Sequence, residues 1–418
     1  MLCSCNESEF EFIQRVIKEI SSTKSNRVHL FVAKYPIGID FQVEAIKLLL
    51  DMDSNDVRII GIHGLGGVGK TTISKAVYNR IADLFEGSCF LENVREMSNI
   101  NGGIIQLQET LLSKILRDRY LKVNGVSEGT SLIKERLHCK KVLLILDDVD
   151  KSKEIENLLG ECNWFSSGSR VIITTRDKQV LATLGRGHQI YRVEELNQCQ
   201  ALELFSLHAF QKSKPEEDYS NLAKQIICYA NGLPLALKIM GSDLCGKSIP
   251  EWKSAIEKYK NILHEDIEKI LRISYDGLGK NEKDIFLDIA CFFKGFHKDD
   301  VVNILDSCNL YPIYGIGKLI DKCLITVDLF GILLMHDLLQ KLGREIVQQE
   351  SEELENRSRI WCYNDAHELL TGNMVCILCF TFFFFFSNIF YSLDLSLFNI
   401  EQKIILTMYV LFKVSKSL

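Results

Sequence analysis

Glycines, a lysine and a threonine stand at a fixed spacing early in the chain, in the run Gly64-Leu-Gly-Gly-Val-Gly69-Lys70-Thr71. This run fits G-x-x-x-x-G-K-[ST], in which glycine conformations turn backbone N–H groups inward onto phosphate oxygens. The lysine reaches the β- and γ-phosphates, and the hydroxyl that follows binds magnesium. The run therefore predicts a nucleotide site. Its expected contacts are Gly64, Gly66, Gly67, Val68, Gly69, Lys70, Thr71 and, at the α-phosphate, Thr72.

Two carboxylates follow an apolar run further along the chain. Asp147 and Asp148 come directly after Val142–Leu146, which is typical of a buried strand. A carboxylate at the end of such a strand, beside a phosphate loop, holds magnesium through its waters, and a second one polarises the attacking water. We expect Asp147, with Thr71, to hold Mg²⁺, and Asp148 to act in catalysis with Lys70. The competing interpretation, a solvated turn after a core strand, is disfavoured by the glycine run upstream.

Three further residues carry weaker signals. Arg176 closes a second apolar strand, where its charge could sense a γ-phosphate, although an arginine at a strand end is equally often a surface residue. Pro234 stands near the first turn of an expected helix, and its spacing alone favours helix initiation. His336 stands at the start of the last clear helix, where a histidine is more often structural than functional. The residues themselves leave these alternatives open.

The elements that must position these residues alternate between strands and helices. The expected strands are Val57–Ile62, Ser88–Leu91, Val142–Leu146, Val171–Thr174 and Ile190–Val193. Helical spacing of Ile73, Ala76, Val77, Ile81 and Leu84 predicts a helix after the glycine run. Strands that alternate with helices indicate an α/β P-loop NTPase domain, a mainly parallel sheet with helices on both faces.

After residue 193 the strand signals mostly stop, which predicts an all-α helical bundle and then three helices and a hairpin, the outline of a winged-helix domain. One helix is expected at Glu282–Phe293, and another carries Met335, Leu338, Leu339, Leu342 and Ile346 on one face. The expected divisions are 1–29, a linker with an amphipathic helix; 30–193, nucleotide binding; 194–260, the bundle; 261–350, the winged helix; 351–373, a linker; and 374–418, a hydrophobic tail.

Composition constrains the class of protein. The formal net charge of −6 argues mildly against a protein whose main function is to bind nucleic acid, so no nucleic-acid partner is expected. Scattered cysteines and charges throughout the first twenty residues indicate reduced thiols and no signal peptide, hence a cytoplasmic protein. Residues 374–393 are almost wholly apolar and long enough to span a bilayer. They are interpreted as a translated non-coding stretch, as a membrane anchor or as a core helix.

The motifs, taken in order, resemble those of the NB-ARC domain of plant disease-resistance proteins. They are GIHGLGGVGKTT, FEGSCFLENVRE from Phe85, KKVLLILDDVD, GSRVIITTRD from Gly168, GLPLAL, LRISYDGL with FLDIACFF from Leu271, and MHDLLQKLGREIV from Met335. The resemblance covers roughly residues 30–365. Asp150 at the end of DDVD, with FLDIACFF, is similar to the subgroup that carries an N-terminal TIR domain and C-terminal leucine-rich repeats.

The resemblance implies roles that the residues alone do not supply. It implies that Arg176 senses the γ-phosphate, that Pro234 packs against adenine and that His336 contacts the β-phosphate of ADP. The segment Ile37-Gly38-Ile39 is similar to the piece that closes over the base. It also implies an ADP-bound resting state, exchange for ATP, slow ATP hydrolysis and oligomers with related receptors.

The chain departs from the family pattern at both ends, which predicts a truncated receptor switch without TIR NADase activity. Three alternatives remain. One is an adaptor or decoy that co-oligomerises with full-length receptors. Another is an ATPase whose winged helix binds DNA, which the sparse basic residues Lys318 and Lys322 disfavour. The last is a motor-like or chaperone-like ATPase with steady turnover.

Overall fold

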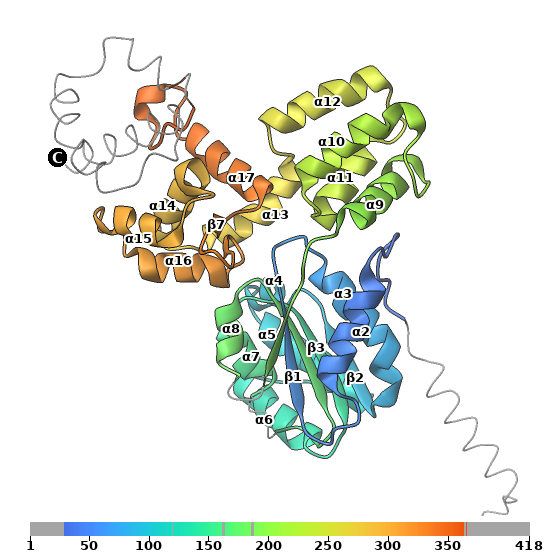
Figure 1. Cartoon of the computed structure of the whole chain (residues 1–418). Coiled ribbons are helices and arrows are strands. Elements are labelled where there is room, and N and C mark those ends of the chain that lie inside the picture. Colours follow the sequence, from blue (N-terminus) through green and yellow to red (C-terminus); the bar gives the residue numbers. More distant parts are fainter. Residues whose placement is uncertain (1–28, 119, 161–163, 185–187, 363–364, 366–418) are drawn as a thin grey trace, which may run out of the picture. The chain divides into compact units, whose positions relative to one another are not determined.

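The computed structural model of the chain describes residues 29–118, 120–160, 164–184, 188–362 and 365. The expected amphipathic helix near residues 6–24 and the apolar segment 374–393 lie outside them. The chain forms two compact units (Figure 1). The first contains the chain up to His63, Lys70–Thr175 and Val180–Arg192, and the second contains Gly64–Gly69, Arg176–Gln179 and the chain from Val193 onward.

Five parallel strands form the centre of the first unit. They are β1 (Arg58–His63), β2 (Gly87–Leu91), β3 (Val142–Val149), β4 (Arg170–Thr175) and β5 (Gln189–Arg192). Their order in the sheet is β2-β3-β4-β1-β5, and each neighbouring pair is parallel. β2 and β4 are buried along their whole length, as expected of strands covered on both faces. The predicted parallel sheet is therefore confirmed.

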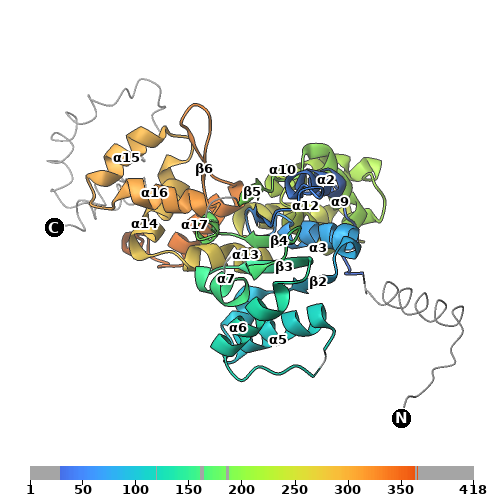
Figure 2. The same cartoon turned by 90° about the horizontal axis from the view of Figure 1, so that it is seen from below.

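Helices cover both faces of this sheet. Between residues 29 and 192 they are α2 (Ile39–Leu50), α3 (Lys70–Ile81), α4 (Val94–Ser98), α5 (Gly103–Leu116), α6 (Val126–Leu137), α7 (Ser152–Leu158) and α8 (Lys178–Ala182). Figures 1 and 2 show α2 and α3 on one face and α5, α6 and α7 on the other. The predicted extension of α3 to Leu84 is wrong: a 3₁₀ turn, η1 (Ala82–Leu84), follows Ile81, and the side chain of Leu84 is 58% exposed.

A buried arginine supports the end of the sheet from which β1 starts. The guanidinium of Arg170, fully buried, donates to backbone oxygens of residues that lie before β1 and beside β4. The acceptors are Leu50, Asp51, Ser54, Asp56 and Ser169, at 2.5–3.0 Å. Because a guanidinium has five N–H donors in a rigid plane, one side chain can satisfy several carbonyls of a turn at once. Arg170 thus fixes the connection from α2 to β1, and with it the register of β1.

The second unit begins with a helical bundle. Its helices are α9 (Gln198–Phe210), α10 (Ser220–Ala230), α11 (Pro234–Leu244) and α12 (Ile249–Asn261), with a 3₁₀ turn, η3 (Glu217–Tyr219), before α10. The buried indole of Trp252 stacks on Phe210, with ring centroids 5.3 Å apart, and meets Tyr219 edge-on. Its Nε1–H donates to the backbone oxygen of Leu244 at 3.1 Å. The bundle therefore has its own aromatic core.

The winged-helix part follows in the same unit. It contains α13 (Glu265–Asp276), α14 (Lys280–Asp288), η4 (Ile289–Phe293), α15 (Lys298–Asp306), α16 (Pro312–Asp321), β6 (Thr326–Val327), β7 (Leu333–Leu334), α17 (Asp337–Gln348) and η5 (Leu354–Asn356). Strands β6 and β7 pair antiparallel, and Gly331 takes a φ of 82° in the hairpin turn. The predicted helices followed by a hairpin are confirmed.

Two helix predictions in the winged-helix part are wrong in detail. The expected continuous helix Glu282–Phe293 ends as a π-helix, η4, rather than as regular α-helix. α17 begins at Asp337 instead of Met335, and its buried face includes Val347, while Ile346 is half-buried. α17 packs closely on η4, since a Cβ added to Gly343 would lie 2.6 Å from the Cβ of Ala290. The π-turn and a glycine thus allow a tight helix crossing that hydrophobic spacing does not reveal.

Candidate functional site

The phosphate loop connects β1 to α3. Gly67 and Gly69 take φ values of 84° and 106°, in the left-handed region that side-chain-bearing residues avoid. A Cβ at Gly69 would meet nothing within 4 Å, so glycine is needed there for its conformation. α3 starts at Lys70, the residue after the loop, and Lys70 is buried. The free N–H groups and the dipole at the start of a helix favour an anion. The loop has the backbone form that cradles an anion.

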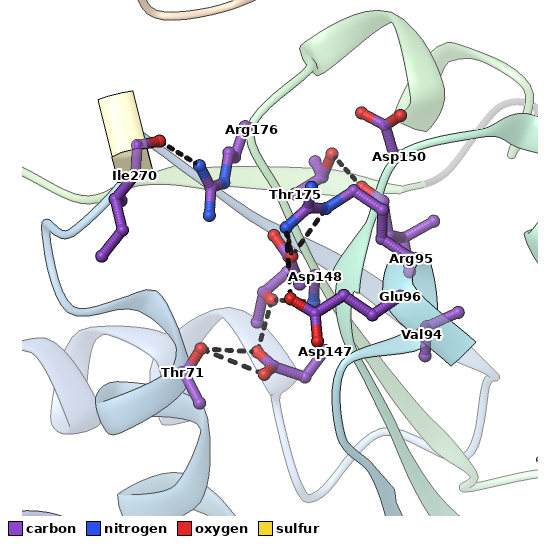
Figure 3. Close-up of polar contacts among 12 residues, drawn as sticks. Thr71, Val94, Arg95, Glu96, Asp147, Asp148, Asp150, Thr175, Arg176 and Ile270 are labelled. Carbon is purple, nitrogen blue, oxygen red and sulfur yellow. Dashed lines mark hydrogen bonds and ion pairs between the residues drawn. The ribbon is translucent and has the colours of Figure 1, made fainter. Parts of the chain in front are cut away.

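Asp147 and Thr71 lie together in the first unit (Figure 3). The Thr71 hydroxyl is 3.0 Å from both carboxylate oxygens of Asp147, which is only 1% exposed. The Thr174 hydroxyl donates to Oδ1 of Asp147 at 2.6 Å. Burial raises the pKa of Asp147, while hydrogen bonds from Thr174 and Thr71 oppose the rise. A buried carboxylate beside a hydroxyl is the oxygen donor set that a hard divalent cation prefers.

These residues fit the protein's share of a magnesium shell. Within the described parts of the chain, no group of three or more acidic, histidine or cysteine side chains gathers as a metal site. Mg²⁺ in nucleotide sites takes one or two protein oxygens and completes its shell with phosphates and water. Thr71 and Asp147 would hold the ion, and Lys70, the residue before Thr71, carries the cation for the phosphates. When bound, the ion would neutralise negative charge that develops on the phosphate oxygens.

Asp148 is the next residue of β3, but its surroundings differ from those of Asp147. The strand register shifts between Leu146 and Val149, and Asp148 has a φ of 57°. The predicted end of this strand at Leu146 is wrong, because β3 continues past Asp147 and Asp148 to Val149. The carboxylate of Asp148 forms an ion pair with Arg95, whose Nη2 and Nε lie 2.7 and 2.9 Å from Oδ2 (Figure 3).

Ile37, Gly38 and Thr72 lie in or beside helices of the first unit. Gly38 has a φ of 72° at the N-cap of α2, and the backbone N–H of Ile37 donates to the oxygen of Tyr35 at 3.0 Å. Thr72 follows Thr71 in the first turn of α3, and its side chain is half-buried. Gly38 is glycine because the chain turns into α2 through a left-handed conformation.

Arg176 belongs to the second unit, where it lies against the phosphate loop. Its Nη1 donates to the backbone oxygen of Ile270 on α13 at 2.9 Å (Figure 3). A Cβ added to Gly66 would lie 2.9 Å from the same Nη1. The next residue, Asp177, pairs with Lys322 at 2.7 Å, and both side chains are largely buried. The segment after β4 is therefore held by winged-helix residues.

Pro234 begins α11 and stands next to the phosphate loop. It occupies the first turn, after the N-cap Leu233. The backbone N–H of Leu235 donates to the oxygen of Gly67 at 3.2 Å, and a Cβ at Gly67 would lie 2.8 Å from the Cβ of Leu235. The predicted role of Pro234 in starting a helix is confirmed, because it is the first residue of α11. The structure adds that this helix start packs against the loop, so Gly67 is needed for close approach as well as for its φ.

His336 is the N-cap of α17. Its Nδ1 accepts the backbone N–H of Leu338 at 3.2 Å, and its Nε2 lies 3.2 Å from the backbone oxygen of Asn231, at the end of α10. Since Nδ1 accepts, the ring proton belongs on Nε2, which donates to Asn231. Burial lowers the pKa of His336, partly opposed by Glu195 and by the bond to Asn231. A neutral imidazole therefore joins the winged helix to the bundle.

The sequence matches two families. Residues 39–215 match the NB-ARC domain, and residues 279–351 match the winged-helix domain of Roq1-like disease resistance proteins. The first segment thus resembles an NB-ARC domain. The P-loop fold and the winged-helix domain predicted from the sequence are thus confirmed.

Relatives that align with most of this chain are disease resistance proteins of plants. The disease resistance protein RUN1 of Vitis rotundifolia is 44% identical over 361 residues, which cover 85% of this chain and 27% of the relative. The TMV resistance protein N of Nicotiana glutinosa is 40% identical over 375 residues, covering 88% of this chain and 32% of the relative. The chain thus spans about a third or less of the length of these relatives.

A solved structure of a Walker-type ATPase from Pyrococcus abyssi aligns with 74% of this chain and 96% of that chain, at 12% identity and a TM-score of 0.49. Among the residues that the structure describes, no helix has both the length and the apolar character needed to cross a bilayer.

Sequence reasoning missed three residues of the NB-ARC site. They are Arg95, which pairs with Asp148, Thr174, which contacts both carboxylate residues, and Thr175, whose hydroxyl donates to the oxygen of Val149 at 2.7 Å. Thr174 and Thr175 stand in β4, and Arg95 stands in α4, the helix that follows β2; β2 and β4 flank β3 in the sheet. Polar residues at the carboxyl ends of adjacent parallel strands meet at one edge. That rule could have found them.

Proposed function

We propose that this chain is the nucleotide-dependent switch of a plant intracellular immune receptor. It binds ADP at rest, exchanges it for ATP with Mg²⁺ and returns to the ADP state by slow hydrolysis. The observation that carries this proposal is the hydrogen bond between Thr71, in the first turn of α3, and the buried Asp147. Their oxygens are suitable ligands for Mg²⁺, and Thr71 closely follows the phosphate loop in the chain. The NB-ARC match and the disease resistance relatives supply the biological setting.

The switch requires groups that contact the nucleotide differently in its two states. We assign the γ-phosphate to Arg176, the adenine to Pro234 with Ile37 and Gly38, and the β-phosphate of ADP to His336. In support, Arg176 and Pro234 stand beside the phosphate loop within the second unit. His336 bonds the winged helix to the bundle, so a nucleotide that competes for this imidazole would alter that joint.

We further propose that the ATP state assembles with related receptors, and that the protein acts in the cytoplasm. DNA binding by the winged helix is the less supported function. Both lysines of α16 and its C-cap are engaged in ion pairs, Lys318 with Glu282 at 3.3 Å and Lys322 with Asp177 at 2.7 Å. Lysines occupied in this way are poor candidates for phosphate contacts in a nucleic-acid groove.

The test is to denature the purified chain and identify the released nucleotide by ion-exchange chromatography. The wild type should carry close to one equivalent of adenine nucleotide, mainly ADP. Lys70→Ala should carry none, because the phosphates lose their cation. Lys75→Ala is the matched control: it lies on the same helix and removes a surface ion pair with Glu92. Wild-type protein without adenine nucleotide and without affinity for it would refute the proposal.

A further inference from the structure

Asp148 has a left-handed backbone conformation, which is uncommon for residues other than glycine. It takes a left-handed φ of 57° at the register shift of β3. Such a conformation is unfavourable for a non-glycine residue, and it persists only where neighbours impose it. A bulge in a strand re-aims a side chain, and bulges are frequent beside active sites. The backbone thus turns the Asp148 carboxylate away from the direction that regular β-structure would give it.

Two contacts impose this conformation. The backbone N–H of Asp148 donates to the hydroxyl of Thr174 at 2.8 Å, and Arg95 binds the carboxylate. Two guanidinium nitrogens of Arg95, Nη2 and Nε, converge on one oxygen, Oδ2, at 2.7 and 2.9 Å. The side chains are only 15% and 16% exposed, which makes this charge-assisted pair stronger and better ordered than a surface ion pair.

The neighbouring carboxylate, Asp147, is bound by hydroxyl groups instead. Asp147 bonds to the hydroxyls of Thr71 and Thr174, the set that fits a magnesium site, whereas Asp148 bonds to an arginine. Arg95 comes from α4, which follows β2, the strand next to β3. The carboxylates of Asp147 and Asp148 therefore have different surroundings. Arg95, which binds Asp148, lies in the segment that follows β2 and not in β3 itself.

We propose that Arg95 is a positioning residue for ATP hydrolysis, which fixes the Asp148 carboxylate where it orients the attacking water. This inference rests on the proposed nucleotide switch. In the reaction, a water oxygen bonds to the γ-phosphorus as the bond to the β,γ-bridging oxygen breaks. The products are ADP and phosphate, and the water's protons end on phosphate and solvent. Arg95 acts through Asp148, so it governs the rate of this step rather than nucleotide affinity.

The experiment is single-turnover hydrolysis of ATP by the whole chain, with ATP and ADP affinities measured separately by titration. Arg95→Met should lower the hydrolysis rate about 10- to 100-fold, the scale that a misplaced reacting group costs. Both affinities should stay within about twofold of the wild type, since the phosphate and metal contacts remain. Arg95→Lys should recover part of the rate because it restores the charge without the forked geometry. Arg58→Met, which removes a surface pair at the start of β1, is the control.

A double-mutant cycle separates positioning from a general structural role. Asp148→Asn should lower the rate at least as much as Arg95→Met, and the double variant should lose no more than Asp148→Asn alone, because the two residues act as a unit. Additive losses, equal losses of affinity and rate, or a faster rate in Arg95→Met would each overturn the inference. Arg95→Gln serves if the methionine variant does not fold.

The wild type separates the two proposals. A chain that binds ATP but hydrolyses it no faster than Lys70→Ala would overturn the role of Arg95 and leave nucleotide binding intact. A chain that binds no adenine nucleotide would overturn the switch itself, and Arg95 with it.

Discussion

The imidazole of His336 and the backbone oxygen of Asn231 join two parts of the second unit, with Nε2 and O 3.2 Å apart. His336 caps α17 of the winged helix, and Asn231 ends α10 of the bundle in a left-handed conformation. Because one ring nitrogen caps the helix while the other reaches the bundle, the residue is held from both sides. The contact depends on a neutral imidazole with a single ring proton.

Removing this imidazole should loosen ADP. We expect His336→Ala to release bound ADP several-fold faster, since it loses the proposed contact between the imidazole and the β-phosphate, worth about 1 kcal/mol. The measurement is displacement of a fluorescent ADP analogue by excess unlabelled ADP. His208→Ala, a histidine on α9 whose Nδ1 lies 3.4 Å from the hydroxyl of Ser242, is the control. Unchanged release from the His336 variant would count against the joint.

The same contact should weaken in mild acid. Burial lowers the pKa of His336 below its usual 6.5, despite the opposing charges of Glu195 and Asp337, so the detached imidazole binds a proton at a pH where the docked one does not. Docking is therefore strongest above about pH 6.5 and weakens as the pH falls through that value toward the lowered pKa. ADP release from the wild type should speed up across this range. The dependence should be flatter in His336→Ala, and a parallel rise in both proteins would exclude His336 as its origin.

Asp147 should govern the magnesium requirement. We expect Asp147→Asn to raise the Mg²⁺ concentration for half-maximal ATP binding about tenfold or more, because an amide oxygen lacks the charge of the carboxylate. ADP binding without metal should change much less. The check is titration of ATP affinity against Mg²⁺, with Asp83→Asn in η1 as the control. An unaltered Mg²⁺ midpoint would remove Asp147 from the metal site.

Gly67 should be required for more than its conformation. Alanine there would take a φ of 84° and place its Cβ 2.8 Å from Leu235, so the phosphate loop would have to move. Gly246→Ala is a matched control, with a φ of 74° and nothing within 4 Å of its Cβ. Both variants should lose about 1–2 kcal/mol of stability from the left-handed conformation. Only Gly67→Ala should also lose ADP affinity, measured by calorimetry; equal affinities in the two variants would contradict this.

Arg170 should be essential for folding of the first unit. Arg170→Met removes five hydrogen bonds to buried or partly buried backbone oxygens, which should cost about 3 kcal/mol or more. The urea midpoint of unfolding, followed by tryptophan and amide signals, measures this loss. Arg80→Met removes an exposed pair with Asp40 and Glu44 and should cost less than about 1 kcal/mol. Equal midpoints for the two variants would disprove the role of Arg170.

The sequence by itself determined the class of fold and the centre of the site. Apolar runs predict the five strands, the glycine run predicts the loop before α3, and the two carboxylates after Leu146 mark the edge of the sheet at which we propose the metal. These features are local, since a strand, a loop and a helix start depend on residues near one another in the chain. Ordered motifs then sufficed to identify the NB-ARC domain.

Only the tertiary structure decided which side chains share a partner. The pairing of Arg95 with Asp148, the docking of Leu235 on Gly67 and the bond from His336 to Asn231 each join residues 53 or more positions apart. No periodicity encodes such contacts, because they depend on strand order and on the packing of separate helices. The left-handed conformation of Asp148 is likewise invisible in the run Leu-Asp-Asp-Val, because aspartate tolerates it only where neighbouring strands supply the bonds that hold it.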